Sequence, residues 1–285
     1  MALTLLSFTF MGFLVIGVPV AFAIGLSSIT AIMVEDLPLA VAFQQMTSGM
    51  NAFSFLAIPF FIFTGELMLY GGIADRIVAF AKSLVGHVRG GLGMSNVVAC
   101  TLFGGVSGSP VADVSAMGSV MIPMMKREGY HADYAVNVTT HAALVGALMP
   151  TSHNIIIYTL AAGGKVSIAA LIAAGVVPAV ILTLCNLAAA YFVARSRGYP
   201  AGTFPGWHIV LRSLVAAAPG LFVVVLIITG ILSGVFTATE SAAVAVLYAL
   251  ALTVFVYRSL TWDQFVRAAS KACLLYTSDA ADEGL

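Results

Sequence analysis

Long uncharged stretches alternate with short charged segments along the whole chain. Seven stretches lack Asp, Glu, Lys and Arg: Met1–Val34, Leu37–Gly65, Gly90–Ala112, Tyr134–Gly164, Val166–Ala194, Ser213–Thr239 and Ser241–Tyr257. A helix needs roughly 20 apolar residues to cross a bilayer, and several stretches are longer. The longer ones must tilt, break or run along the interface, because each helical residue adds about 1.5 Å. The pattern predicts an all-α, polytopic transmembrane helical bundle.

The composition agrees with a membrane protein. Apolar residues make up 61% of the 285 residues and charged residues only 8%, whereas soluble domains have about a quarter charged. So little charge excludes a water-exposed globular surface. The cysteines at 100, 185 and 273 show no metal-ligand or disulfide spacing. The run from Leu3 to Val34 is too long for a signal-peptide core, so we expect a retained first span.

Basic residues are clustered between the uncharged stretches. The clusters are Arg76, Lys82 and Arg89; Lys126 and Arg127; Arg195, Arg197 and Arg212; and Arg258, Arg267 and Lys271. If Leu3–Val34 crosses outward once, counting the later crossings puts all of these clusters on one side and leaves Lys165 on the other. The positive-inside rule then predicts a cytoplasmic N-terminus. Two full spans or one re-entrant hairpin at Gly90–Met125 fit this count equally well.

Between the second and third stretches, apolar residues recur at helical spacing from Ile73 to Val88. Charged residues and a histidine lie among them. Such a pattern is typical of an amphipathic helix at the membrane interface, and a cytosolic connector helix fits it as well. Just before it, we expect Glu66 to lie at the interface, near the turn at Gly71-Gly72.

The segment from Leu102 to Asp113 combines glycine, serine and proline between two apolar arms, Gly91–Thr101 and Val114–Met125. Glycines 104, 105 and 108 favour turns and unwound backbone. Ser109 suits an N-cap and Pro110 the first helical position, so a helix should begin there. We predict a helical hairpin with an unwound tip. Short, Gly/Pro-interrupted apolar segments point to the binding site of a transporter.

The hairpin tip offers ligands for an ion and for an anion. Carbonyl and hydroxyl oxygens at Ser107, Gly108 and Ser109 suit a hard cation, and the helix N-terminus favours a carboxylate. An ordinary Gly-rich loop outside the membrane is the simpler alternative. Asp113 is the single charge between Gly90 and Met125. In the first turn of a helix the macrodipole stabilises an anion by roughly 0.3–1 kcal/mol, so we interpret it as a positioning residue.

A second break is predicted between Gly146 and Asn154. Pro150 has no N–H, so the Gly146 carbonyl loses its helical partner and must find another one. Four polar residues follow the proline: Thr151, Ser152, His153 and Asn154. An ordinary proline kink explains this pattern too. If both breaks serve one site, we expect Gly146 and the tip to approach within about 10 Å. Sodium would then lie at Ser107, Ser109 and Gly146.

The sequence lacks the motifs of nucleotide-binding proteins and of zinc enzymes. Gly164-Lys165 lacks the P-loop spacing, and the histidines form no H-E-x-x-H pair. We therefore expect no ATP site, no zinc enzyme and no cofactor besides a coupling ion. A membrane-embedded enzyme acting on lipids or peptides is the alternative function, and it would need Asp113 paired with His141 or His153. A non-transporting scaffold would leave the polar tip unexplained. The run Thr237 to Glu240 predicts a capping box that begins a helix.

Taken together, these motifs resemble a known family, the large membrane subunit (DctM type) of tripartite ATP-independent periplasmic (TRAP) transporters. The resembling segments are Gly65–Met68 with Gly71–Ala74, Gly86–Leu92, Phe103–Asp113 with Ile122–Met125, Pro150–Ser152 and Thr237–Tyr248. In this chain Thr151 and Ala238 stand where the family has proline. The family also has a second, inverted half with another hairpin, which we expect this chain to lack.

The resemblance implies sodium-coupled import of an organic anion by a bacterial inner-membrane permease. The substrate would be a dicarboxylate, keto acid, sugar acid or sialic acid. A periplasmic solute-binding protein would deliver it, a small four-helix membrane subunit would be the partner in the bilayer, and the hairpins would move in an elevator-type motion. No nucleic-acid partner is expected.

The last residues, Cys273 to Glu283, read unlike the rest of the chain. They resemble the read-through translation of a sequencing adapter. We therefore expect a permease domain over residues 1–272, followed by a non-native segment over 273–285 that packs against nothing specific.

A depth measurement tests the hairpin. Because both arms are short, we predict that Gly90–Met125 is re-entrant and that residues 107–109 lie near the membrane midplane. Spin labels at these positions should report the midplane, and a location at the outer membrane face would contradict the prediction.

Overall fold

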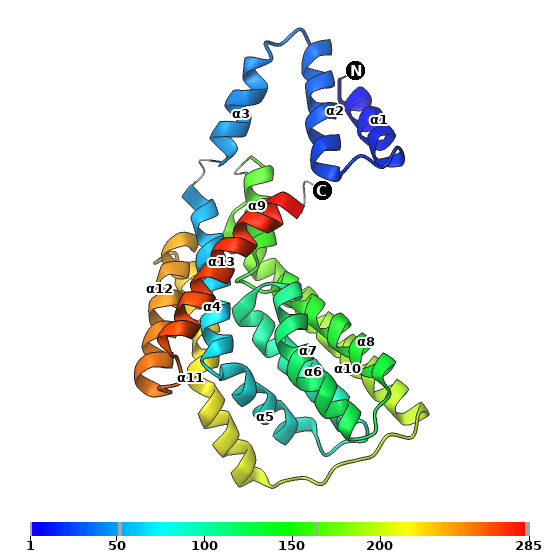
Figure 1. The fold of residues 1–285 in the computed structure, drawn as a ribbon, viewed down its shortest axis with the longest axis vertical. Helices are drawn as coiled ribbons and strands as arrows, with labels where there is room; N and C mark the ends of the chain where they lie inside the picture. Colours follow the sequence, from blue (N-terminus) through cyan, green and yellow to red (C-terminus); the bar gives the residue numbers. More distant parts are fainter. Residues whose placement is uncertain (1, 51–52, 164, 283–285) are drawn as a thin grey trace. The chain divides into compact units, whose positions relative to one another are not determined.

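The computed structural model describes residues 2–50, 53–163 and 165–282, and within them all side chains except those of residues 49, 50, 54, 160 and 275–282. Each element in these ranges is helical (Figure 1). Three of the described helical segments are long and apolar enough to cross a membrane, residues 168–196, 207–232 and 238–256. The prediction of an all-α membrane bundle is confirmed. The chain forms two compact units, residues 1–55 with 273–285, and residues 56–272.

The first unit begins with two helices that fold back on each other, α1 (Ala2–Val15) and α2 (Val20–Val34), followed by α3 (Ala40–Met50). Thr30 Oγ1 donates to Thr9 Oγ1 over 3.5 Å between α1 and α2. The prediction of one continuous span over Leu3–Val34 is therefore wrong. Gly17 has a φ of +87°, and Pro19 lacks the N–H that a continuous helix needs. The count of membrane spans made from the sequence began with one span here, so that count no longer holds. The cytoplasmic location of the N-terminus stays a prediction.

The second unit contains the remaining helices. They are α4 (Ala57–Tyr70), α5 (Ile73–Val85), α6 (Gly91–Ser107), α7 (Pro110–Arg127), α8 (Ala132–Ala143), α9 (His153–Ala161), α10 (Ile168–Ser196), α11 (Trp207–Leu232), α12 (Ala238–Ala251) and α13 (Trp262–Asp282), of which residues 262–272 belong to this unit. Short helical turns lie at η2 (Leu144–Leu148) and η3 (Leu252–Val256), and η1 (Phe53–Leu56) spans the boundary between the units in the sequence.

Helix α6 lies at the centre of this unit and contacts α4, α5, α7, α8 and α10 (Figure 1). Its buried residues are spread around the helix and are mostly small, such as Gly93, Ala99 and Gly104. Small side chains let neighbouring backbones approach closely, as is usual where helices associate in membranes. The hairpin that carries the predicted tip is therefore enclosed on several sides.

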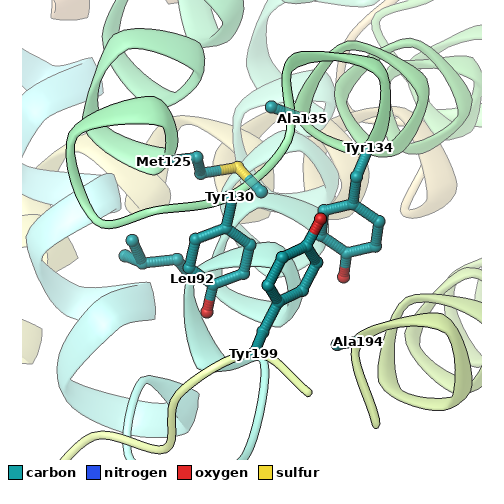
Figure 2. Packing of buried hydrophobic residues seen from close by; sticks show 7 residues of the cluster. All are labelled: Leu92, Met125, Tyr130, Tyr134, Ala135, Ala194 and Tyr199. Atoms are coloured by element: carbon teal, nitrogen blue, oxygen red, sulfur yellow. The ribbon is translucent and has the colours of Figure 1, made fainter. Parts of the chain in front are cut away.

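Aromatic packing joins α6, α7, α8 and the loop after α10 at one end of the unit. Tyr130, Tyr134 and Tyr199 lie beside one another against Leu92 and Met125 (Figure 2). The Tyr134 hydroxyl donates to the Ala190 carbonyl over 2.8 Å, and the Tyr199 hydroxyl accepts from the backbone N–H of residue 131 over 3.1 Å. Buried tyrosines of this kind combine a large apolar contact with a fixed polar end.

The basic clusters meet at this same end. Lys82 pairs with Glu128 over 3.2 Å, and Arg197 pairs with Asp133 over 2.8 Å. A hydrogen bond from Arg197 holds the pKa of Asp133 below its usual range. A backbone bridge joins residues 89 and 201. Members of three of the basic clusters thus lie at one end of this unit, and their side of the membrane stays a prediction. Exposed ion pairs contribute only about 0–1 kcal/mol each, so the aromatic packing contributes more to this end.

The predicted amphipathic helix is present as α5, which bends by 70° from α4 at Gly71-Gly72. Its apolar face is buried, with Ile73, Ile77 and Ala81 each at 0% exposure. A sharp bend and one buried face suit both a helix along the interface and a connector, so both alternatives stand.

Helix α13 continues to Asp282 without a break at residue 273. The side chains from residue 275 onward lie outside the described residues, as does the backbone of 283–285. The expectation that the last segment packs against nothing specific therefore stays a prediction.

The capping box that begins α12 gives a stability prediction. Thr237 Oγ1 accepts from the Glu240 N–H over 3.3 Å, and Glu240 accepts from the Thr237 N–H over 2.8 Å, as the sequence predicted. Replacing Thr237 by Ala should lower the free energy of unfolding by about 1 kcal/mol, because an N–H at the helix start loses its acceptor. Thr229→Ala is the control, since its hydroxyl bonds only carbonyls of its own helix. Equal losses for both variants in a denaturation titration in detergent would contradict the assignment.

Candidate functional site

The hairpin tip is tighter than the sequence predicted. Helix α6 continues through Gly104 and Gly105 to Ser107, so only Gly108 and Ser109 separate it from α7. The expected unwinding at Gly104 and Gly105 is wrong, because their carbonyls find partners in the helix or nearby. Gly108 ends α6 in the left-handed region, with a φ of +62°, and its N–H bonds the Gly104 carbonyl over 3.0 Å. Such a C-terminal cap needs a residue without a β-carbon.

The start of α7 agrees with its prediction. Ser109 is extended, its hydroxyl accepts from the Ala112 N–H over 3.4 Å, and Pro110 is the first helical residue. Both arms are longer than expected, at 17 and 18 residues, or about 26–27 Å at 1.5 Å per residue. That is slightly less than the hydrocarbon core of about 30 Å, so the re-entrant depth remains a prediction.

Asp113 is fully buried beneath the tip. The Ser107 hydroxyl donates to Asp113 Oδ1, and the Ser109 N–H donates to Ser107 Oγ over 3.3 Å. The Asp113 N–H bonds the Ser109 carbonyl over 2.9 Å, which places the carboxylate in the first turn of α7. There the helix macrodipole favours a negative charge. Its other oxygen, Oδ2, is buried without a hydrogen-bond partner among the described residues.

The second break agrees with its prediction. Helix α8 tightens into η2, Pro150 follows, and α9 begins at His153, so the predicted discontinuous helix is confirmed. Pro150 has no N–H to donate to the Gly146 carbonyl, which accepts instead from the Met149 N–H over 3.2 Å. The carbonyl thus finds another partner, because a tighter helical turn supplies a donor three residues on.

The two breaks meet, as predicted. Thr151 Oγ1 donates to the Gly105 carbonyl over 3.2 Å. A β-carbon built on Gly108 would overlap the Thr151 carbonyl, and one built on Gly104 would lie 2.9 Å from Gly146 Cα. The predicted approach within about 10 Å is therefore confirmed as direct contact. Glycines 104, 108 and 146 have no side chain, so the backbones of the two breaks can touch. We call this contact between residues 104–108 and 146–151 the crossing.

Two buried side-chain oxygens without partners, among the described residues, belong to the segments that meet here. Asp113 Oδ2 lies between α6 and η2, since a β-carbon on Gly104 would lie 2.8 Å from it and one on Gly146 2.5 Å. The Ser152 hydroxyl is also buried without a partner in the described part of the chain. Buried polar groups are normally satisfied. A carboxylate and a hydroxyl with free acceptor capacity suit a hard cation such as sodium.

The structure brings together most of the predicted site residues. Ser107, Gly108, Asp113, Gly146, Pro150, Thr151 and Ser152 all lie buried at the crossing of the two breaks or directly beside it. Ser109 is half-buried at the tip, His153 is half-buried at the start of α9, and Asn154 is exposed. Gly65 and Gly104 also contact the crossing and were not among the predicted site residues, although Gly104 was assigned to the tip. A glycine inside an apolar helical run signals a close helix approach, and both fit that signal.

The pairing required by the enzyme alternative is absent for His141. Its side chain is exposed on α8, and its Nδ1 bonds the carbonyl of Asn137, whereas Asp113 is fully buried against Ser107. No group of three or more His, Cys, Asp or Glu side chains comes together within the residues that the structure describes.

Comparison with known proteins gives a family match over most of the chain. The model of the family described as tripartite ATP-independent periplasmic transporter, DctM component, matches residues 7–278. The chain therefore belongs to the DctM family. It is 39% identical over 262 residues to the C4-dicarboxylate TRAP transporter large permease protein DctM of Vibrio cholerae, covering 91% of this chain and 57% of that protein.

Two further DctM-family relatives match over similar lengths. The sialic acid TRAP transporter large permease protein SiaM of Vibrio cholerae is 39% identical over 260 residues, covering 91% of this chain and 60% of SiaM. The DctM of Rhodobacter capsulatus is 35% identical over 278 residues, covering 91% and 63%. The chain thus spans about three-fifths of the length of these relatives. Family membership and the apolar helices make it a multi-pass membrane protein.

Gly108 gives a test of the crossing. Replacing it by Ala should lower the free energy of unfolding by more than about 2 kcal/mol, because the β-carbon meets both a left-handed backbone and the Thr151 carbonyl. Gly25→Ala on α2 is the control, since a β-carbon there meets nothing within 4 Å. The two variants are compared by denaturation in detergent. Losses of equal size would show that the breaks do not press against each other.

Proposed function

We propose that this chain acts in the large membrane subunit of a sodium-coupled secondary transporter that imports small organic acids. The supporting observation is the crossing of two helix breaks around Asp113, whose Oδ2 has free acceptor capacity. A cation bound there would neutralise a buried carboxylate that is costly to leave uncompensated. Coupling follows, because the same segments form the tip where an anion would dock.

The sodium ligands that we propose are oxygens of the crossing. Ser107 and Asp113 share a hydrogen bond, and Ser152 adds a hydroxyl, so these residues fit a hard cation. Ser109 and Gly146, which the sequence also suggested, already have partners for the hydroxyl and the carbonyl. Each of these oxygens retains a second lone pair, so they remain candidate ligands in the proposal.

The organic anion is proposed to bind at the start of α7. The first N–H groups of a helix have no intrahelical acceptor, and the macrodipole adds partial positive charge. Carboxylates are common ligands of such helix ends. The printed substrates of the relatives, C4-dicarboxylates and sialic acid, both carry carboxylates. The substrate class that we propose is therefore small organic acids, including keto and sugar acids.

The proposed partners follow from the family. They are a small membrane subunit in the same bilayer and a periplasmic solute-binding protein that delivers the anion. We place the protein in the bacterial inner membrane with its N-terminus and its basic end in the cytoplasm. Basic residues gathered at one end of the second unit support a cytoplasmic location of that end.

A sodium titration tests the proposal. Bound sodium should raise the thermal midpoint of the purified chain in detergent, because a ligand at 100 times its Kd adds about 2.7 kcal/mol of stability. Potassium at equal ionic strength should not. Asp113→Asn should abolish the sodium-dependent rise, since the neutral amide removes the charge that attracts the ion.

The control is Asp133→Asn, an exposed carboxylate at the basic end. It should keep the full sodium response. A sodium-dependent rise that survives in Asp113→Asn, or an equal rise with potassium, would contradict the proposed cation site.

A further inference from the structure

The hairpin tip also rests against a helix outside both breaks, α4. A β-carbon built on Gly65 would lie 3.2 Å from Ser107 Cα and 3.4 Å from Ser107 Cβ. Both residues are buried. The α4 backbone therefore forms the wall against which the end of α6 is packed, with no side chain between them.

Helix α4 is held in place from its other faces. Lys271 Nζ on α13 pairs with Glu66 Oε1 over 2.7 Å, and Glu66 is 3% exposed. The expected depth of Glu66, at the membrane interface, stays a prediction. The rings of Phe63 and Phe265 meet edge to face with centroids 5.7 Å apart. A buried carboxylate paired to a neighbouring helix resists displacement, because breaking the pair leaves an uncompensated charge.

The lower end of α4 is held as well. The Ser259 hydroxyl donates to the Gly71 carbonyl over 2.8 Å. A β-carbon on Gly71 would overlap the Thr253 side chain, so η3 packs directly against this turn. Helix α4 has little room to retreat from the tip.

Ser107 is confined from the opposite side too. Its hydroxyl is bonded to Asp113, and the next residue, Gly108, presses on the Thr151 carbonyl. Ser107 thus lies between the rigid wall of α4 and the second break. Any atom added at position 65 must move Ser107 by a few tenths of an ångström.

We infer that Gly65 is a positioning residue for the cation site, which it serves by fixing the place of Ser107. The inference rests on the proposed function and adds to it a residue that touches no ion. Ligand distances in metal sites are typically held to about 0.2 Å, so a shift of a few tenths in Ser107 changes the site. A residue without a β-carbon at 65 is therefore required for ion affinity more than for folding.

The test is a sodium titration of the thermal midpoint in detergent for the full chain and for Gly65→Ala. We expect the half-saturating sodium concentration to rise by about 10-fold or more, the usual range when a partner of a metal ligand is changed. The midpoint without sodium should stay near that of the parent chain, because alanine suits a helix better than glycine.

Gly118→Ala on α7 is the matched control. Its β-carbon would meet the flexible end of Ile122 at 3.3 Å and Thr139 at 3.6 Å, both side-chain atoms away from the crossing. Its sodium response should equal that of the parent chain. A rise in half-saturation for Gly118→Ala as large as for Gly65→Ala would overturn the inference.

A double variant separates positioning from general stability. Gly65→Ala with Glu66→Gln weakens the hold of Lys271 on α4 and gives the added methyl group room. If Gly65 acts by fixing the place of Ser107, the double variant should bind sodium within about threefold of the affinity of the parent chain. Two substitutions in contact need not be additive, so the double variant is measured directly. If Gly65→Ala fails to fold, the double variant alone is titrated with the same expectation. A double variant that binds sodium no better than Gly65→Ala overturns the inference.

The outcomes also separate the two proposals. A parent chain without any sodium-dependent rise overturns the proposed function, and the inference with it. A parent chain that responds to sodium, with Gly65→Ala responding equally well, overturns only the role of Gly65.

Discussion

In the hydrocarbon of a membrane an unpaired backbone N–H or C=O group costs several kcal/mol, and two helix breaks in this chain have to meet that constraint. They meet it with one hydrogen bond between the breaks and with tighter turns inside each break. Thr151 donates to the Gly105 carbonyl, a cap at Gly108 returns an N–H to α6, and η2 tightens so that the Gly146 carbonyl keeps a donor. The unusual backbone is tolerated because it is buried in protein rather than in lipid.

Close approach is what makes this pairing possible. Glycines at 104, 108 and 146 bring backbone against backbone, and Gly65 does the same from α4. The cost of such positions is entropic, because glycine loses more freedom on folding than other residues. The gain is a crossing in which the buried groups left without partners are side-chain oxygens, on Asp113 and Ser152. In the function that we propose, these free side-chain oxygens are ligands of the cation.

Contacts elsewhere in the second unit hold together the helices that surround the crossing. The tyrosine cluster and two ion pairs tie the ends of α5, α7, α8 and α10 together. The Lys271–Glu66 pair and Thr253 hold α4 from the far side. The crossing is thus enclosed by helices with few ways to separate, which suits a site whose ligands must keep their distances.

From the sequence alone the all-α membrane class, the start of α7 at Ser109-Pro110, the break at Pro150 and the capping box at Thr237 were predictable. Each depends on local chemistry: run length, a missing N–H, or a side chain that caps its own helix. Tertiary structure decided the rest. It brought the two breaks into contact through Thr151 and Gly105, packed Gly65 of α4 against Ser107, and paired Lys271 with Glu66. Those outcomes depend on which backbones approach one another across the bundle, and the spacing of residues along one helix holds no information about a neighbour far away in the chain.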